Sequence, residues 1–258
     1  MAAARQWPEL LGNAGYDLPR RRISVLASVG TGTHAATTYQ LNDIIRTGNL
    51  GSLDDSIAVG LQAFRDDIVE GVQYDDSISN ANEAERQIGR LARLYYVVAA
   101  PRIRPRRTEY ALKATMGNAI ISGRPDVVTV TGPFTCGVRD TKTGRRMRNH
   151  HAQLGAYSLL VKTDESAMGS GILPDALGVD FLKRGSASTA PEYKAKIYPV
   201  GECEKLAWAT MKSICFTMER FTKSGNPDEW QMNPNSILCS EKWCPAYAST
   251  WCFIGREG

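Results

Sequence analysis

Residues 123–144 read GRPDVVTVTGPFTCGVRDTKTG, and this stretch of the chain decides the fold. The β-branched run Val127–Thr131 predicts a strand, and Gly132-Pro133 predicts a turn after it. A second strand is expected over residues 137–142, with Gly144 ending it. We therefore expect an antiparallel hairpin that places the start of its first strand beside the end of its second.

Two carboxylates and a lysine are expected to converge on this hairpin. Asp140 and Lys142 are two residues apart on the second strand, so their side chains share one face of the sheet. Asp126 would lie beside Asp140, and Glu109, on an expected preceding strand, is a further candidate carboxylate. Carboxylate oxygens suit Mg²⁺ or Mn²⁺, and a nearby lysine can orient or deprotonate a bound water. An exposed cross-strand pair would also explain Asp140 and Lys142.

Helical and extended patterns alternate around the hairpin. Apolar residues at spacings of three and four predict helices, and β-branched runs predict strands. The expected helices span residues 58–72, 80–100, 147–161 and 202–223, and further strands are expected at 108–115, 119–121, 178–184 and 193–199. A tight turn at Gly30–His34 is expected to open one more helix. This order indicates a single α/β domain with a central mixed β-sheet flanked by helices.

The composition is that of an ordinary globular protein. The chain has 258 residues, of which 43% are hydrophobic and 22% charged, and its formal net charge is +4. These values argue against a collagen-like, coiled-coil or wholly disordered chain, and the length provides ample core for one large domain. No apolar run approaches the ~20 residues that cross a bilayer, and residues 1–22 lack signal-peptide order. We expect a cytoplasmic protein without a membrane partner.

Arginines gather in three clusters, and their rigid, permanently charged forks suit phosphate groups. The clusters are Arg20, Arg21 and Arg22; Arg102, Arg104, Arg106 and Arg107; and Arg145, Arg146 and Arg148. Solvated surface patches explain them equally well. The third cluster is the most informative, because it directly follows the strand that carries Asp140 and Lys142.

Three further residues accompany the carboxylates. His34 ends the Gly-Thr-Gly-Thr run, and Gln153 and Tyr157 stand four residues apart on one face of the helix that follows the Asp140 strand. Taken alone, His34 is typical of a structural histidine and Tyr157 of a core aromatic residue. Their order along the chain makes them more informative than that.

Four short motifs, taken in order, resemble those of the PD-(D/E)XK nuclease superfamily in its RecB-like exonuclease branch, which includes phage-encoded members. The matches are Gly-x-x-x-His at Gly30 to His34, Gly-x-x-Asp at Gly123 to Asp126, Asp-x-Lys at Asp140 to Lys142, and Gln-x-x-x-Tyr at Gln153 to Tyr157. Each motif is weak alone, and the shared order within a strand–turn–strand–helix frame makes the combination specific. The matched region covers about half of the chain.

The resemblance implies a metal-dependent DNA exonuclease acting on linear ends, with phage recombination or DNA processing as its setting. It implies that Asp126 and Asp140 bind Mg²⁺ or Mn²⁺ and that Lys142 assists the attacking water. His34 would lie at the metal or the scissile phosphate. Gln153 and Tyr157 would orient Lys142 or the DNA backbone. At the start of the flanking helix, three arginines could bind the phosphates: Arg145, Arg146 and Arg148.

Alternatives stay open at this stage. The motifs do not separate an exonuclease from an endonuclease or nickase of the same superfamily. A DNA-binding module that kept the fold without catalysis would carry the same pattern. A recombinase or single-strand annealing protein as partner, double-stranded or single-stranded DNA as substrate, and a homo-oligomeric state are all compatible with the resemblance.

Three late cysteines are candidate metal ligands, namely Cys239, Cys244 and Cys252. Some RecB-like relatives hold a [4Fe–4S] cluster with one upstream and three late cysteines, so the resemblance makes these residues candidate ligands of a cluster or of Zn²⁺. No cysteine precedes Cys136, which leaves the upstream ligand missing and favours buried free thiols. We divide the chain into a lead-in over residues 1–22, a nuclease domain over 23–226, and a Cys- and aromatic-rich cap over 227–258 packed on the same domain.

Overall fold

The computed structural model describes residues 23–116, 119–163, 172–186 and 188–224. The predicted lead-in and the predicted C-terminal cap, with its three late cysteines, lie outside this range. The described helices are α2 (Val25–Thr47), α3 (Leu53–Asp67), α4 (Ala81–Leu94), α5 (His151–Thr163) and α6 (Val200–Ser224), with a π-helical turn (Tyr95–Ala99) and a 3₁₀ turn (Ala100–Arg102) after α4. None of these helices is long and apolar enough to span a membrane.

A five-stranded mixed sheet forms the centre of the fold, as predicted. Its order is β3-β6-β7-β8-β9, in which β7 and β8 run parallel and the other neighbours antiparallel. The strands are β3 (Pro105–Thr108), β6 (Val127–Val130), β7 (Thr135–Gly144), β8 (Leu173–Lys183) and β9 (Glu192–Tyr198). The predicted hairpin is present as β6 and β7, with Val127 opposite Arg139.

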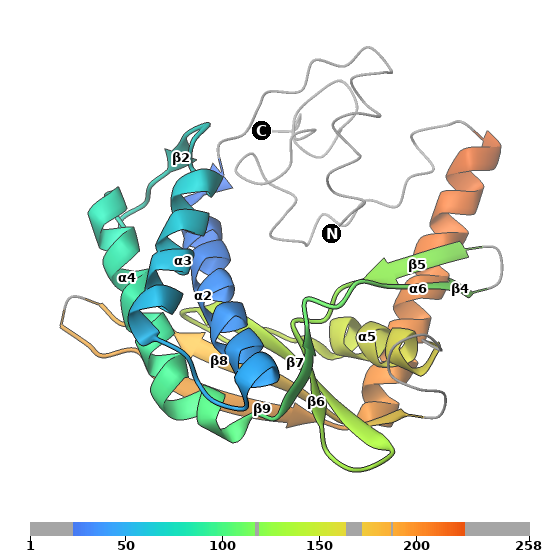
Figure 1. Cartoon of the computed structure of the whole chain (residues 1–258). Helices are drawn as coiled ribbons and strands as arrows, with labels where there is room; N and C mark the ends of the chain where they lie inside the picture. The colour runs from blue at the N-terminus through green and yellow to red at the C-terminus, as the bar shows by residue number, and fades with distance from the viewer. Residues whose placement is uncertain (1–22, 117–118, 164–171, 187, 225–258) are drawn as a thin grey trace. The chain divides into compact units, whose positions relative to one another are not determined.

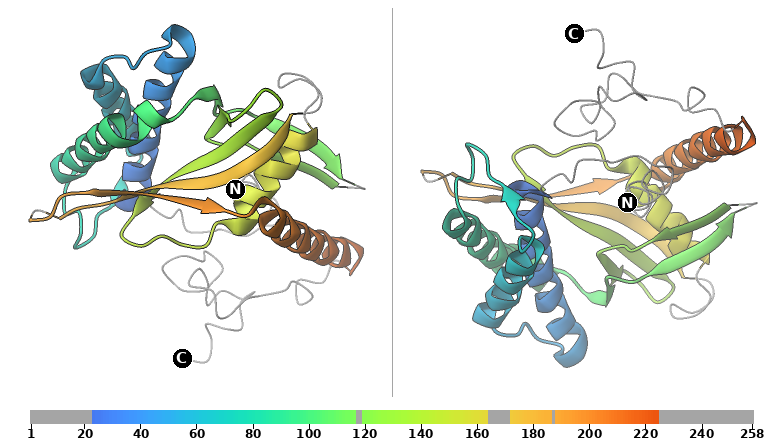
Figure 2. Two further views of the ribbon diagram at one scale, coloured as in Figure 1. Left: turned by 90° about the horizontal axis from the view of Figure 1, so that it is seen from below. Right: turned by 90° about the horizontal axis from the view of Figure 1, so that it is seen from above.

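The two faces of the sheet carry separate hydrophobic cores, because neighbouring strand residues point to opposite faces. Val127 and Leu182 join the core that α2, α3 and α4 build on one face. Val128 and Phe181, each one residue away, join the core that contains Leu154 of α5 on the other. Figures 1 and 2 show the three helices on one side of the sheet and α5 on the other. Residues Ile23–Lys212 form one compact unit around this sheet.

The strand expected over 108–115 is present only from Leu112, because the chain leaves the central sheet after Thr108. β3 ends at Thr108 and a separate strand, β4, begins at Leu112. Between them Glu109 has a φ of 48°, in the left-handed region that residues other than glycine rarely adopt. Its N–H donates to the carbonyl of Asp126 at 3.0 Å. β4 then pairs with β5 (Ala119–Gly123) in a two-stranded antiparallel sheet that packs on α5.

The expected tight turn at Gly30–His34 is wrong. These residues lie inside α2, which begins at Val25 after Ser24, whose side chain accepts a hydrogen bond from the N–H of Leu26. Gly32 lets α2 cross α3 at close range and does not form a turn. A Cβ on Gly32 would lie 2.7 Å from the carbonyl oxygen of Gly60 on α3, so only glycine allows this approach.

The helix that follows β7 starts later than predicted. α5 begins at His151 and not at Met147: the N–H of Leu154 donates to the carbonyl of His150 at 3.0 Å, and just before the helix the side chain of Asn149 accepts the N–H of His151 at 3.0 Å in a turn. The segment from Arg145 to Arg148 therefore forms the connection between β7 and α5. The arginines that the sequence assigned to the helix start are exposed residues of this connection.

Gly32→Ala is expected to lower the stability of the fold by about 1–3 kcal/mol, since the added methyl group overpacks the α2–α3 crossing. Urea unfolding followed by circular dichroism measures the effect. Gly89→Ala on α4 is the matched control: its Cβ would sit 3.9 Å from Ile57 in ordinary contact. Replacing this helical glycine is expected to be neutral or to stabilise by about 0.5–1 kcal/mol. Equal stability of the two variants would contradict the packing argument.

Candidate active site

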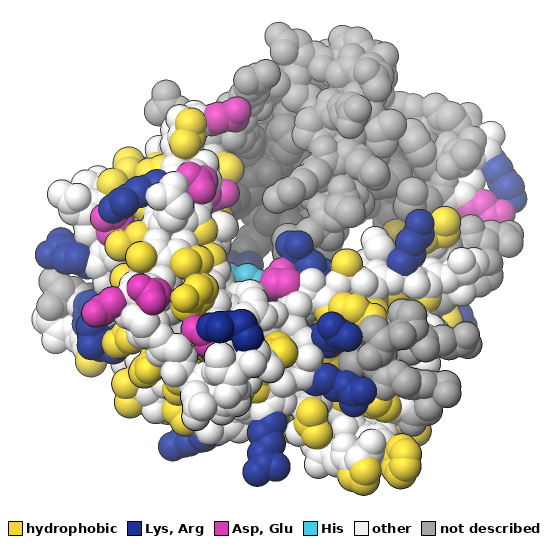
Figure 3. All heavy atoms as spheres, in the orientation of Figure 1, with side chains coloured by type: hydrophobic (Ala, Val, Ile, Leu, Met, Phe, Trp, Pro, Cys, Tyr) yellow, Lys and Arg dark blue, Asp and Glu magenta, His cyan; other side chains and the backbone are white. Residues whose placement is uncertain are grey.

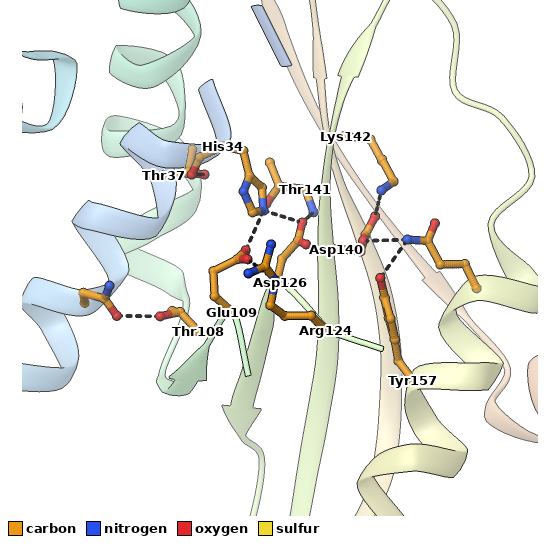
Figure 4. A network of polar contacts seen from close by, with 12 residues as sticks. His34, Thr37, Thr108, Glu109, Arg124, Asp126, Asp140, Thr141, Lys142 and Tyr157 are labelled. Carbon is orange, nitrogen blue, oxygen red and sulfur yellow. Dashed lines mark hydrogen bonds and ion pairs between the residues drawn. The ribbon is translucent and has the colours of Figure 1, made fainter. Parts of the chain in front are cut away.

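Asp126, Asp140 and Lys142 lie together at the β6–β7 hairpin, as the strand pattern predicted (Figure 4). Asp126 immediately precedes β6, and its Oδ2 accepts the backbone N–H of Thr141 at 2.7 Å. Lys142 Nζ lies 2.7 Å from Asp140 Oδ2 in an ion pair. The Asp140 side chain is 1% exposed. A buried carboxylate, its lysine and a second carboxylate thus occupy one side of the strand.

His34 and Glu109 complete a cluster of ligand-type atoms on the other side of Asp126. His34 points from α2 with its Nε2 3.0 Å from Asp126 Oδ2 and 3.1 Å from Glu109 Oε1. The ligand atoms of His34, Glu109 and Asp126 all lie within 4.8 Å of one another. Figure 4 shows this group between α2 and β7, and on the face seen in Figure 3 a histidine side chain lies beside acidic and basic side chains.

The arrangement fits a divalent cation. One imidazole nitrogen and two carboxylates form a donor set of the kind used for Mn²⁺ and Mg²⁺. Glu109 Oε1 is buried and accepts no hydrogen bond from the described residues, although His34 faces it. An unsatisfied buried oxygen is costly in a closed structure, and a bound cation would satisfy it.

Asp140 is not part of that three-residue group, because its carboxylate is held by other residues. Lys142 occupies Oδ2, and Gln153 Nε2 donates to Oδ1 at 3.2 Å. The same Gln153 nitrogen donates to Tyr157 Oη at 3.0 Å. Gln153 therefore orients Asp140 directly, Tyr157 acts on Asp140 through Gln153, and both reach Lys142 through Asp140. The role of Asp140 as a metal ligand stays a prediction.

Crowded carboxylates shape the electrostatics of the site. The pKa of Asp140 is raised to about 7, first by its burial and then by the negative charge of Asp126, against the opposing charge of Lys142. Burial also raises the pKa of Glu109, and Asp126 adds to the effect while His34 and Arg124 oppose it. Both shifts have the same cause, which is negative charge held out of water beside more negative charge.

The pKa values of the two cationic groups are raised as well, which in their case favours the charged form. Burial by itself lowers the pKa of His34, but the hydrogen bond and charge of Asp126, together with the charge of Glu109, outweigh it, so the pKa is raised. Burial likewise lowers the pKa of Lys142, and Asp140 more than compensates. Lys142 therefore carries its positive charge in this state and acts as a cation next to Asp140.

Sequence reasoning missed Arg124, which lies within the Gly123–Asp126 motif. Its Nε is 2.8 Å from Glu109 Oε2, so it forms an ion pair with a member of the cluster. The sequence feature that could have identified Arg124 is its position two residues before Asp126. A phosphate-binding role stays a prediction for three exposed arginines between β7 and α5: Arg145, Arg146 and Arg148.

Asp140→Asn is expected to stabilise the metal-free protein at pH 8 by about 1–3 kcal/mol while abolishing activity. A carboxyl whose pKa is raised on folding loses stability as pH rises from its unfolded value near 4 to its folded value of about 7. The wild type should lose stability over that window in EDTA, and the variant should lose less, since only Glu109 and His34 of the cluster still have raised pKa values. Thermal melts from pH 4 to pH 8 measure this.

Asp75→Asn is the control of opposite sign. Burial alone would raise the pKa of Asp75, but hydrogen bonds from Ser77 and Ile78 outweigh it, so the pKa is lowered. That variant should be less stable than the wild type at neutral pH, with the difference vanishing in acid. Identical pH profiles for Asp140→Asn and the wild type would contradict the electrostatic account.

Comparison with known proteins places the chain in a family. A model of the "PD-(D/E)XK nuclease superfamily" matches residues 17–249. A crystal structure described as "Putative exonuclease" from Eubacterium rectale is similar at 12% identity and a TM-score of 0.45, covering 79% of this chain and 73% of that one. The structure of SSO0001 is similar at 14% identity and a TM-score of 0.29, covering 82% and 86%. No curated protein matches. Because the family model spans most of the chain, including the whole hairpin site, the chain belongs to the PD-(D/E)XK nuclease superfamily.

Proposed function

We propose that the protein is a metal-dependent DNA exonuclease that hydrolyses phosphodiester bonds at linear DNA ends. Membership of a nuclease superfamily supports phosphodiester hydrolysis. The observation that carries the proposal is the cluster of His34, Glu109 and Asp126, next to the Asp140–Lys142 ion pair. DNA recombination or processing, in a phage-encoded context, is the proposed setting.

His34, Glu109 and Asp126 would hold the cation, which we propose to be Mg²⁺ or Mn²⁺, with Asp140 as a further proposed ligand. When bound, such a cation polarises a phosphate oxygen and lowers the pKa of a water ligand. The imidazole nitrogen suits Mn²⁺ and the carboxylates suit both ions. Zn²⁺ or a [4Fe–4S] cluster at the three late cysteines is a separate proposal that rests on the resemblance alone.

Lys142 would stabilise negative charge as the phosphodiester is attacked. Its ammonium group is fixed beside Asp140, and a preorganised cation aimed at developing charge is effective in a partly buried site. Lys142 would also orient the attacking water by donating a hydrogen bond to it. Gln153 and Tyr157 would hold Asp140, and through it the lysine, in place.

Two other functions remain candidates. An endonuclease or nickase would use the same cluster, and a DNA-binding module would keep the fold without useful catalysis. The superfamily membership supports a catalytic role over the binding module, since the acidic cluster and the lysine are both present. We also propose a recombinase or single-strand annealing protein as a partner, and a homo-oligomeric state. Both would suit an enzyme that acts on linear DNA.

Lys142→Ala is expected to reduce kcat by about 10²–10³-fold with folding intact, because one preorganised cation near the scissile phosphate is lost. Release of labelled nucleotides from linear DNA in Mg²⁺ measures it, and EDTA should abolish activity in the wild type. Lys183→Ala is the matched control, since Lys183 of β8 also pairs with a carboxylate, Glu192 of β9 at 2.8 Å, and neither residue belongs to the candidate site. Equal activity of Lys142→Ala and the wild type would overturn the assigned role.

Substrate topology separates the candidate functions. End-labelled linear duplex, linear single strand and closed circular DNA should be incubated with Mg²⁺, with Mn²⁺ and with EDTA. The exonuclease is expected to degrade linear DNA and leave the circle intact. Cleavage of the circle would identify an endonuclease. Binding of DNA without metal-dependent cleavage of any substrate would favour the binding module.

A further inference from the structure

We infer that the outer face of the β4–β5 hairpin is a binding surface for the nucleic-acid backbone, in which Arg124 holds the phosphate next to the scissile one and Lys113 holds the following phosphate. The inference rests on the proposed nuclease function. It assigns to the hairpin a phosphate-binding role that the sequence analysis predicted for the segment from Arg145 to Arg148.

Arg124 lies at the edge of the cation cluster with most of its charged fork available. Its Nε is 2.8 Å from Glu109 Oε2, and Glu109 Oε1 is 3.1 Å from His34. The guanidinium thus contacts one of the three candidate metal ligands directly. The Arg124 side chain is 64% exposed, and within the described part of the chain Glu109 is its one ion-pair partner.

The backbone at Arg124 is held rigidly against the helix that carries Gln153 and Tyr157. A Cβ on Gly123 would lie 2.8 Å from Leu160 and 3.1 Å from Tyr157, so the strand approaches α5 as closely as glycine permits. Pro125 follows and is buried. The base of the Arg124 side chain therefore keeps a constant position relative to Asp126, which a phosphate-binding residue at this site requires.

The hairpin has one packed face and one open face. Leu112, Ala114 and Ile121 pack in the core that contains α5. Lys113 is opposite Ser122 in the register, and both side chains are exposed. Arg124 is also exposed and directly follows Gly123, the last residue of β5, so it lies at the end of the hairpin nearest Asp126. The exposed hairpin residues continue outward to the pair formed by Thr115 and Ile120.

The charge on this face is complementary to a phosphate chain. The described strands β4 and β5 contain no acidic residue, whereas Glu109, Asp126 and Asp140 concentrate negative charge at the site. A DNA strand entering that cluster needs cations flanking it. Lys142 supplies one beside Asp140, and Arg124 supplies another beside Glu109 (Figure 4).

An arginine is better suited to this place than a residue that only neutralises Glu109. A lysine would neutralise the carboxylate equally well, but the guanidinium fork can keep its Nε on Glu109 and offer both terminal nitrogens to a phosphate. An exposed ion pair is worth about 0–1 kcal/mol, so rearranging it toward a phosphate costs little.

Arg124→Gln is expected to raise KM for a short linear duplex about 10-fold and to change kcat less than 3-fold. The salt dependence of binding should also weaken, with the slope of log K against log[salt] falling by about 1 on duplex DNA, and by about 2 in the double variant with Lys113→Gln. Arg65→Gln is the matched control. Arg65 is 56% exposed and bonds Glu85 at 2.8 Å between α3 and α4, so it is an equivalent ion pair away from the hairpin.

A neutral-backbone substrate locates the contact. A duplex with a single methylphosphonate adjacent to the first scissile bond lacks one phosphate charge. The methylphosphonate is placed in turn on each side of that bond. At one of the two positions it should lower kcat/KM about 10-fold for the wild type and for Arg65→Gln. At that position it should not lower the kcat/KM of Arg124→Gln any further. Equal additional losses for all three proteins at both positions would overturn the inference.

Two results distinguish this inference from the proposed function. Binding measured in Ca²⁺ or EDTA needs no cleavage, so the salt slopes test the hairpin surface even if the wild type cleaves nothing. If Arg124→Gln instead raises the Mg²⁺ concentration needed for activity while its salt slope equals that of the wild type, Arg124 only positions Glu109, and the inference is wrong.

Discussion

The pairing of β7 on both of its edges is the constraint on which the rest of the site depends. β7 runs antiparallel to β6 and parallel to β8, so its backbone cannot rotate, and its side chains alternate strictly between two faces. Asp140 and Lys142 face the side of α5. Arg139 faces the other side, where it forms a buried ion pair with Asp180 of β8. A shift by one residue would exchange these two sets, so the same pairing that builds the core positions the chemistry.

The site that results is electrostatically unfavourable without a cation. Asp126 lies between His34 and the buried Asp140, and Glu109 is held in a left-handed conformation at the end of β3. Strained backbone and raised carboxyl pKa values both oppose folding, and residues kept in such a state usually serve a function. The surrounding structure compensates through Lys142, Arg124 and the Thr141 N–H, each of which contacts one carboxylate.

The β4–β5 hairpin connects the fold to the substrate. In the sequence it lies between Glu109 and Asp126, so a member of the ligand cluster flanks it on each side. One of its faces packs on α5, which carries the residues that hold Asp140. The hairpin, the helix and the carboxylates therefore form one rigid assembly, and a backbone bound on the open face of the hairpin would enter the site in a fixed register.

The sequence by itself determined the mixed α/β class, the β6–β7 hairpin and the meeting of Asp126 with Asp140 and Lys142, because a strand period of two and a Gly-Pro turn are local properties. Its four motifs also named His34, Gln153 and Tyr157. Only the tertiary structure decided that Gly30–His34 lies inside α2, that the chain turns out of the sheet at Glu109, and that Arg124 pairs with Glu109. These features depend on the close crossing of α2 with α3 and on the packing of the β4–β5 hairpin on α5. Such contacts join residues distant in the chain, and no local pattern encodes them.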